Sequence, residues 1–135
     1  MHLFKARDIS KRFGGVIALS DASFEFSGAK ICGLVGANGS GKTTFAKICA
    51  GLIKKDSGNF NIDGESVEIN SPYDAKKYGI VLAHQNLSLI PDLTVWENIF
   101  LGHEERKGRM FPNNRNAKDL ALEILNDLIP KEIST

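Results

Sequence analysis

The residues whose types and spacing most clearly suggest chemistry lie in the stretch GLVGANGSGKTTF, at positions 33–45. Residues 36–43 fit the pattern G-x-x-x-x-G-K-(S/T), in which glycines let successive backbone N–H groups turn inward and form an anion site. In this pattern Lys42 reaches the β- and γ-phosphates, and the hydroxyl of Thr43 ligates a Mg²⁺ ion that bridges them. The spacing therefore predicts a site built around a polyphosphate.

The whole loop, together with the residue that follows it, is a candidate for phosphate binding. Its small residues contribute backbone N–H groups, and Thr44 is a candidate further donor to the α-phosphate. The candidate residues are Gly36, Ala37, Asn38, Gly39, Ser40, Gly41, Lys42, Thr43 and Thr44. The alternative is a glycine-rich turn that holds no ligand, and the flanking residues argue against it.

Apolar patterning places the loop between a strand and a helix. Residues 30–35, KICGLV, form a short apolar run that is typical of a strand buried on both faces. After the loop, apolar side chains recur at helical spacing as far as Ile53. Residues 80–83, IVLA, predict another compact apolar strand, and residues 18–26 predict a half-buried one. The order strand, glycine loop, helix is the context that the phosphate-binding pattern requires.

Turn and capping signals define the elements between residues 58 and 79. Residues 58–69 predict a hairpin whose turn, Asp63-Gly64, tolerates positive φ. A short helix should follow, because Ser71 can cap it, a proline suits its first position, and Gly79 can close it in a left-handed conformation.

Two more helices are expected near the end of the sequence. Thr94 and Glu97 have the spacing of a capping box, which predicts a helix ending near Gly102. Residues 117–129 place their apolar side chains on one helical face. The polar residues 104–116 between them are best interpreted as a solvated loop, since their basic side chains lack the interleaved aromatics of a nucleic-acid patch.

Composition limits the class of protein. With 135 residues the chain has about one domain's worth of sequence, of which 42% is hydrophobic and 24% charged, as in ordinary globular proteins. A formal charge of +1 gives no support for a nucleic-acid partner or an anionic membrane surface. No apolar run approaches the roughly 20 residues that would span a bilayer.

Three stretches, together with the phosphate loop, resemble the ATP-binding subunit of an ABC transporter over nearly the whole chain up to about Gly102. They are KRFGGVIAL at 11–19, AGLIKKDSGNFNIDGESV at 50–67 and IVLAHQNLSLIPDLTVWENIFLG at 80–102. The resemblance implies an α/β P-loop NTPase fold of the ABC ATPase type, here partial. It would comprise an F1-like core with an antiparallel β-subdomain and would end before the family's signature motif.

The resemblance also implies roles for residues outside the phosphate loop. Phe13 would stack on adenine, with Val16 beside it, and Gln85 would match the glutamine that contacts Mg²⁺ or its water and moves with the transmembrane partner. Lys42 and Gln85 are then the catalytic candidates, Thr43 and Gln85 the metal ligands, and ATP and Mg²⁺ the cofactors.

The stretch after Gln85 is most similar to importers of simple sugars of the ribose and galactose type. One departure is Asn86, where those importers usually have a glutamate. The resemblance further implies peripheral attachment to the cytoplasmic face of the membrane. The implied partners are permease subunits, a second nucleotide-binding domain in a dimer and, indirectly, a solute-binding protein, with no nucleic acid.

Several catalytic motifs of the family do not occur in these 135 residues. The sequence has no apolar strand that ends in Asp-Glu, no LSGGQ signature and no match to the family's switch histidine. Residues 1–135 are therefore interpreted as the N-terminal part of a nucleotide-binding domain, with the phosphate loop at 36–43, the Q-loop around 85 and the start of a helical subdomain at 94–135. In isolation this part is expected to bind nucleotide weakly at best and not to hydrolyse ATP detectably.

Two other function classes stay open at this point. A small-molecule kinase with the same loop would need an arginine-rich lid, and residues 106–115 are the one candidate segment. A non-catalytic nucleotide-binding module would also lack the Asp-Glu strand. Adenine stacking ahead of the loop and the matching Gln85 argue against the kinase.

Overall fold

The computed structural model describes residues 3–28, 31–84, 89–101 and 114–128, and the chain divides into two units, Met1–Ala83 and His84–Thr135. The first unit contains β1 (Leu3–Phe13), β2 (Val16–Ser27), α1 (Lys42–Cys49), β3 (Ser57–Ile62), β4 (Glu65–Val67) and α2 (Pro72–Lys77). The second contains α3 (Val95–Phe100) and α4 (Asn114–Leu128). Among the described residues, no helix has the length and apolar character needed to cross a membrane.

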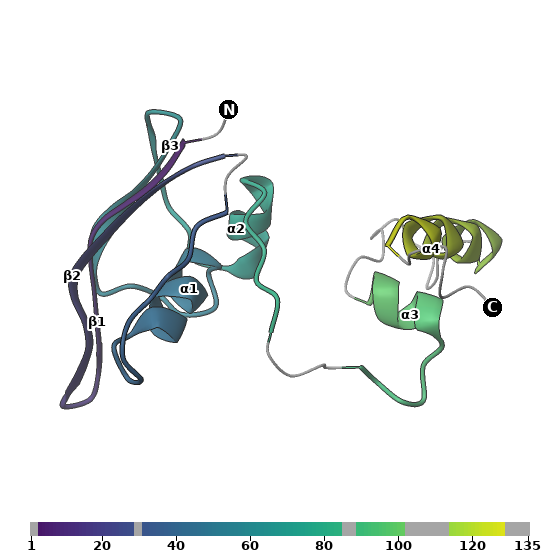
Figure 1. Cartoon of the computed structure of the whole chain (residues 1–135), viewed down its shortest axis with the longest axis horizontal. Helices are drawn as coiled ribbons and strands as arrows, with labels where there is room; N and C mark the ends of the chain where they lie inside the picture. The colour runs from purple at the N-terminus through teal and green to yellow at the C-terminus, as the bar shows by residue number, and fades with distance from the viewer. Residues whose placement is uncertain (1–2, 29–30, 85–88, 102–113, 129–135) are drawn as a thin grey trace. The chain divides into compact units, whose positions relative to one another are not determined.

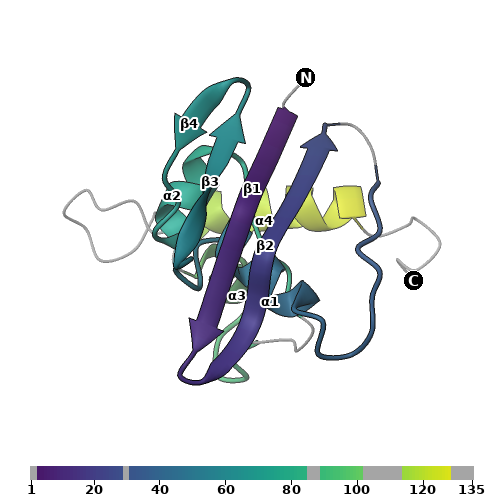
Figure 2. The same ribbon diagram turned by 90° about the vertical axis from the view of Figure 1, so that its left-hand side faces the viewer.

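The strands of the first unit form one four-stranded antiparallel sheet with the order β2-β1-β3-β4 (Figure 2). The half-buried strand predicted at 18–26 is confirmed as part of β2, and the hairpin predicted at 58–69 is confirmed as β3 and β4. Asp63 and Gly64 form its turn with φ of 54° and 94°, because a two-residue hairpin loop requires a left-handed backbone at both positions.

The core of this unit lies between the sheet and α1 and α2, which lie on the same face of the sheet (Figure 1). The largest fully buried side chains are Phe60, Ile9, Ile48 and Ile69. Phe24 of β2 meets Phe45 of α1 edge to face, with ring centroids 6.0 Å apart. Burial of this apolar face holds α1, and the loop at its N-terminus, against β2.

Helix α2 has the boundaries that its capping residues predict. The Ser71 side chain accepts a hydrogen bond from the backbone N–H of Asp74, and its hydroxyl donates to the Asp74 carboxylate at 2.8 Å. Gly79 has φ of 72°, the left-handed conformation that follows many helix ends. The predictions of the serine cap and the closing glycine are confirmed.

The two apolar strands predicted at 30–35 and 80–83 are wrong for this structure. Residues 31–37 and 80–84 have no strand conformation, and Ile31, Val35 and Val81 are 103%, 93% and 79% exposed. A strand that is buried on both faces needs hydrogen-bonding neighbours on both sides. Among the described residues the sheet is formed by β1 to β4 alone, and neither segment is paired with any of these strands.

Helix α1 is also shorter than its apolar pattern predicts. It ends at Cys49, and Leu52 is exposed, while Ile53 packs against the core from the turn that follows. Gly51, with φ of 70°, ends the helix, because its left-handed backbone breaks the helical path.

In the second unit, the predicted capping box and amphipathic helix are both present. The Glu97 carboxylate accepts hydrogen bonds from the backbone N–H of Thr94 at 2.8 Å and from its hydroxyl at 2.6 Å. Helix α4 begins three residues before the predicted start at 117 and takes in the end of the predicted loop. The rest of that loop lies outside the described residues.

This capping box predicts an acid transition in α3. The pKa of the Glu97 carboxyl is lowered, first by the hydrogen bond from the Thr94 hydroxyl and then by the one from its N–H. Because the folded-state pKa lies below the unfolded one, the contribution of Glu97 to stability is complete above the unfolded value and is lost as the pH falls through the folded one. We expect the fluorescence of Trp96, the one tryptophan, to change below about pH 4.

The matched variant is Glu97→Gln, which keeps an acceptor at the same place but has no carboxyl to titrate. Its Trp96 fluorescence should depend less on pH between about 2 and 5 than that of the unmodified chain. Superimposable acid titrations of the two proteins would show that the capping carboxylate does not control the stability of α3.

Candidate functional site

The predicted phosphate loop lies at the start of α1, and its residues 36–40 are exposed. Gly39 and Gly41 have φ of 81° and 88°, values that favour glycine, so the loop uses its glycines where the backbone turns. The Ser40 N–H donates to the Ala37 carbonyl at 3.2 Å, which closes a turn inside the loop. The resulting backbone is curled and open to solvent.

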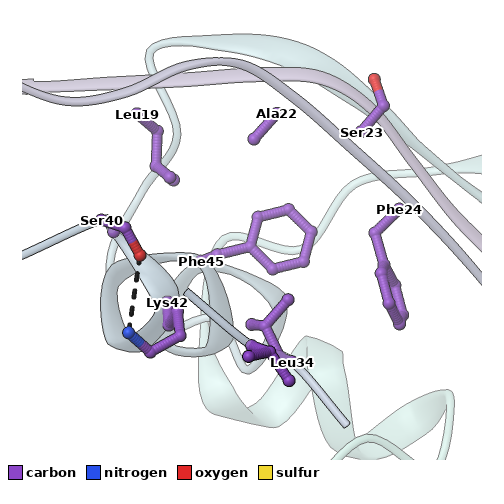
Figure 3. Close-up of a pocket in the computed structure, with 10 residues that line it drawn as sticks. Leu19, Ala22, Ser23, Phe24, Leu34, Ser40, Lys42 and Phe45 are labelled. Atoms are coloured by element: carbon purple, nitrogen blue, oxygen red, sulfur yellow. Dashed lines mark hydrogen bonds between the residues drawn. The ribbon is translucent and has the colours of Figure 1, made fainter. Parts of the chain in front are cut away.

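The Lys42 side chain turns back into this loop. Its Nζ donates to the carbonyl oxygens of Gly36 and Ala37, both at 2.7 Å, and lies 3.5 Å from the Ser40 hydroxyl oxygen, as the dashed line in Figure 3 shows for the last pair. Three contacts therefore hold the one ammonium group of the loop against residues 36, 37 and 40. A cation in this position is placed to neutralise an anion enclosed by the loop.

Gly41 is required by close packing as well as by its backbone angle. A Cβ atom at this position would lie 2.5 Å from the Ala18 carbonyl oxygen and 2.6 Å from Cδ2 of Leu19. Strand β2 thus passes directly against the point where the loop becomes α1. The sequence pattern predicts a glycine here for its conformation, but it contains no sign of the neighbours that exclude a side chain.

Behind the loop lies a small cavity of about 150 Å³. Figure 3 shows Phe45 and Leu34 facing the β2 side chains across it, with Ser40 and Lys42 at one side. Most of its lining is apolar, and of the predicted phosphate-binding residues only Ser40, Gly41 and Lys42 contribute to it. The cavity belongs to the apolar side of the loop, so the open face of the loop is the better place for a charged ligand.

The first turn of α1 supplies the remaining polar groups. Thr43 is exposed and Thr44 half-buried, and their N–H groups belong to the helix N-terminus, where backbone donors lack partners within the helix. This turn contains no acidic residue that would compete with an anion. Backbone N–H donors, an ammonium group and an exposed threonine hydroxyl are a donor set that fits a polyphosphate and a hard divalent cation.

The two residues predicted to contact a base lie together at the hairpin between β1 and β2. Phe13 pairs with Val16 across the turn, and their side chains are 48% and 68% exposed. An exposed aromatic ring at a strand end can present a face to a flat ligand. Nζ of Lys11 lies 5.5 Å from the centroid of this ring.

Other candidates are not placed by the structure. Gln85 and Asn86 lie outside the described residues, as does most of the basic segment proposed as a kinase lid. Among the described residues, no group of three or more His, Cys, Asp or Glu side chains is arranged to hold a metal ion. Of the predicted metal ligands, only Thr43 is therefore described.

Sequence reasoning missed the residues that support the site from a distance. Ala18 and Leu19 lie so close to Gly41 that a side chain there would clash with them. Asp56 accepts a hydrogen bond from Lys11, which is 45 positions away in the sequence. Alternation along β1 places Lys11 on the same side of the strand as Phe13, which is the one local signal available. Nothing in the sequence near Asp56 indicates its partner.

Comparison with known proteins gives matches along most of the chain. The family described as ABC transporter matches residues 19–134. The ribose import ATP-binding protein RbsA of Rhodopirellula baltica is 48% identical over 102 residues, which are 76% of this chain and 20% of that protein. The xylose/arabinose import ATP-binding protein XylG of Sulfolobus acidocaldarius is 39% identical over 126 residues, 93% of this chain and 50% of that protein.

A solved structure adds a similarity of fold. It is described as a dimeric post-hydrolysis state of an ATP-binding cassette bound to ADP and Pi. It is 27% identical in sequence, with a TM-score of 0.65, over 91% of this chain and 56% of that one. The chain spans about a fifth of the RbsA relative and half of the XylG relative.

Proposed function

This chain belongs to the ABC transporter family, and from that we propose that it is the N-terminal part of the ATP-binding subunit of an importer. The whole protein would couple ATP binding and hydrolysis to the uptake of a small solute. Relatives named as importers of ribose and of xylose or arabinose support a sugar as that solute.

The observation that carries this proposal is the placement of Lys42. Its ammonium group lies within 2.7 Å of two loop carbonyls and faces a curl of backbone that contains two left-handed glycines. A nucleotide tail in this loop would contact backbone N–H groups of residues 36–44 and the Lys42 ammonium. The N-terminus of α1 adds a favourable dipole for negative charge.

Mg²⁺ is the implied metal of this site. When bound, it would supply positive charge that stabilises the phosphates of the nucleotide. Thr43 is the residue of the described chain whose hydroxyl would hold it, and Gln85 would supply an uncharged amide oxygen. Lys42 and Gln85 remain the proposed catalytic residues.

Partners and location follow from the same premise. We expect the whole protein to act at the cytoplasmic face of a membrane, bound to permease subunits and paired with a second nucleotide-binding domain. The dimeric state of the solved relative supports the pairing. A solute-binding protein would take part indirectly, and nothing supports a nucleic-acid partner. The 135 residues alone should not release phosphate, since they contain no Asp-Glu strand and no LSGGQ.

The proposal is tested by titrating the chain with Mg-ATP and with Mg-tripolyphosphate, which has no base. Both should bind, and Phe13→Ala should weaken Mg-ATP binding about fivefold or more, because base–aromatic stacking contributes about 1–3 kcal/mol. The same change should leave tripolyphosphate binding within about twofold, because the phosphates do not use the ring.

Tyr73→Ala is the matched control, since Tyr73 is another exposed aromatic of the same unit with a lysine over its ring. It should change neither affinity. Because these 135 residues are expected to bind nucleotide weakly, the titration extends to millimolar ligand. Calorimetry that still detects no binding of either ligand to the unmodified chain would overturn the proposed function.

A kinase remains the weaker candidate. Its proposed lid is not described by the structure, and the importer relatives match the chain on both sides of the phosphate loop. A phosphotransfer screen with small-molecule acceptors should therefore be negative. A non-catalytic module would bind nucleotide in the same loop. The coding sequence of the whole protein separates the two functions, because an importer ATPase should contain the Asp-Glu strand and a non-catalytic module should lack it.

A further inference from the structure

Asp56 forms hydrogen bonds with three consecutive residues near the end of β1, two of them through its carboxylate and one through its backbone N–H. The backbone N–H of Asp56 donates to the Ser10 carbonyl at 2.9 Å. Its Oδ1 accepts from Nζ of Lys11 at 2.7 Å, and its Oδ2 accepts from the backbone N–H of Arg12 at 2.7 Å. Each of these contacts crosses from the residue just before β3 to the strand that leads into Phe13.

These contacts lie at the point along β1 where its pairing with β3 ends. Pairing between β1 and β3 ends at Ser10 and Ser57, so the last residues of β1 pair with β2 alone. Asp56 supplies a hydrogen-bond partner to this side of β1 where the neighbouring strand has ended. The backbone one residue before Phe13 is thereby held by a side chain instead of a strand.

The same carboxylate also controls what lies beside the Phe13 ring. The Lys11 ammonium that it binds is 5.5 Å from the ring centroid, within the range of a cation–π contact. The Lys11 side chain is only 15% exposed, whereas that of Asp56 is 45% exposed. The pKa of Asp56 is lowered, chiefly by its hydrogen bond from Lys11, so the carboxylate is charged at neutral pH.

We propose that Asp56 is a positioning residue for base binding, which holds Lys11 against one face of the Phe13 ring and leaves the other face for the base. This inference rests on the proposed function, since it assumes that Phe13 stacks on a nucleotide. It assigns to Asp56 no contact with the nucleotide itself. Its effect on binding passes through Lys11 and the backbone at Arg12.

The test compares Asp56→Asn with Glu68→Gln in the full chain. Glu68 accepts from Lys55, whose Nζ lies 5.9 Å from the ring centroid of Phe60, so the two variants each remove the charge from a carboxylate–lysine–aromatic group. Phe60 is fully buried and cannot meet a ligand. We expect Asp56→Asn to weaken Mg-ATP binding about two- to fivefold, and Glu68→Gln to leave it unchanged.

Binding of Mg-tripolyphosphate separates positioning from a general loss of structure. Asp56→Asn should leave this affinity unchanged, because only the base uses Phe13, whereas a loosened fold would weaken both ligands. In the Phe13→Ala background, Asp56→Asn should have no further effect on Mg-ATP, as expected when two residues act through one interaction.

The outcomes distinguish the two proposals. If neither ligand binds the unmodified chain, the proposed function fails. If Mg-ATP binds and Phe13→Ala weakens it, but Asp56→Asn has no effect or weakens both ligands equally, the positioning role of Asp56 is wrong. Additive effects of Asp56→Asn and Phe13→Ala would overturn it as well.

Discussion

Lys42→Ala should weaken binding of Mg-ATP and of Mg-tripolyphosphate about 10- to 150-fold, which corresponds to the roughly 1.5–3 kcal/mol contributed by a hydrogen bond to a charged group. The Lys42 ammonium lies 2.7 Å from two carbonyl oxygens of the loop, so it should contact an anion that the loop encloses. Lys42→Ala should lower the affinity for both ligands to a similar degree. Phe13→Ala should lower only the affinity for Mg-ATP, because tripolyphosphate has no base.

Lys47→Ala provides the control for charge. Lys47 lies in the last turn of the same helix, so its removal changes the net charge equally without changing the loop. Calorimetric titration should give this variant the affinity of the unmodified chain. If Lys42→Ala bound tripolyphosphate as tightly as Lys47→Ala does, the loop would not be the phosphate site.

Gly58→Ala should cause the largest loss of stability among glycine substitutions in the sheet. Gly58 has φ of 93°, and a Cβ there would lie 2.5 Å from the Asp8 carbonyl oxygen and 2.6 Å from that of Arg7. Both atoms are backbone in the central strand β1 and cannot move aside as a side chain could. We expect the free energy of unfolding to fall by about 2–5 kcal/mol, the sum of left-handed strain and overpacking.

Gly64→Ala isolates the packing contribution. Gly64 has nearly the same φ, 94°, but a Cβ there would meet nothing within 4 Å. Its substitution should cost only the backbone strain, about 1–2 kcal/mol. Urea denaturation followed by circular dichroism measures both variants. Equal losses would mean that β1 and β3 can separate at Gly58 at little cost, contrary to the packing described here.

The sequence determined those features that depend on neighbouring residues. The glycine loop before α1, the Asp63-Gly64 turn, the Ser71 cap and the capping box at Thr94 are all visible in it, because each requires specific residue types within a few positions. All four lie where they are expected along the chain. The family resemblance rests on the same local patterns, and the family comparison agrees with it.

Tertiary structure alone decided the features that depend on distant neighbours. Residues 31–35 and 80–83 have strand-like composition but no strand conformation in the described chain, because a strand exists only where another strand accepts its hydrogen bonds. The contact of β2 with Gly41 and the hydrogen bond between Asp56 and Lys11 also join residues that are far apart in the sequence. Such contacts arise from the register and twist of the sheet, which residue types alone do not specify.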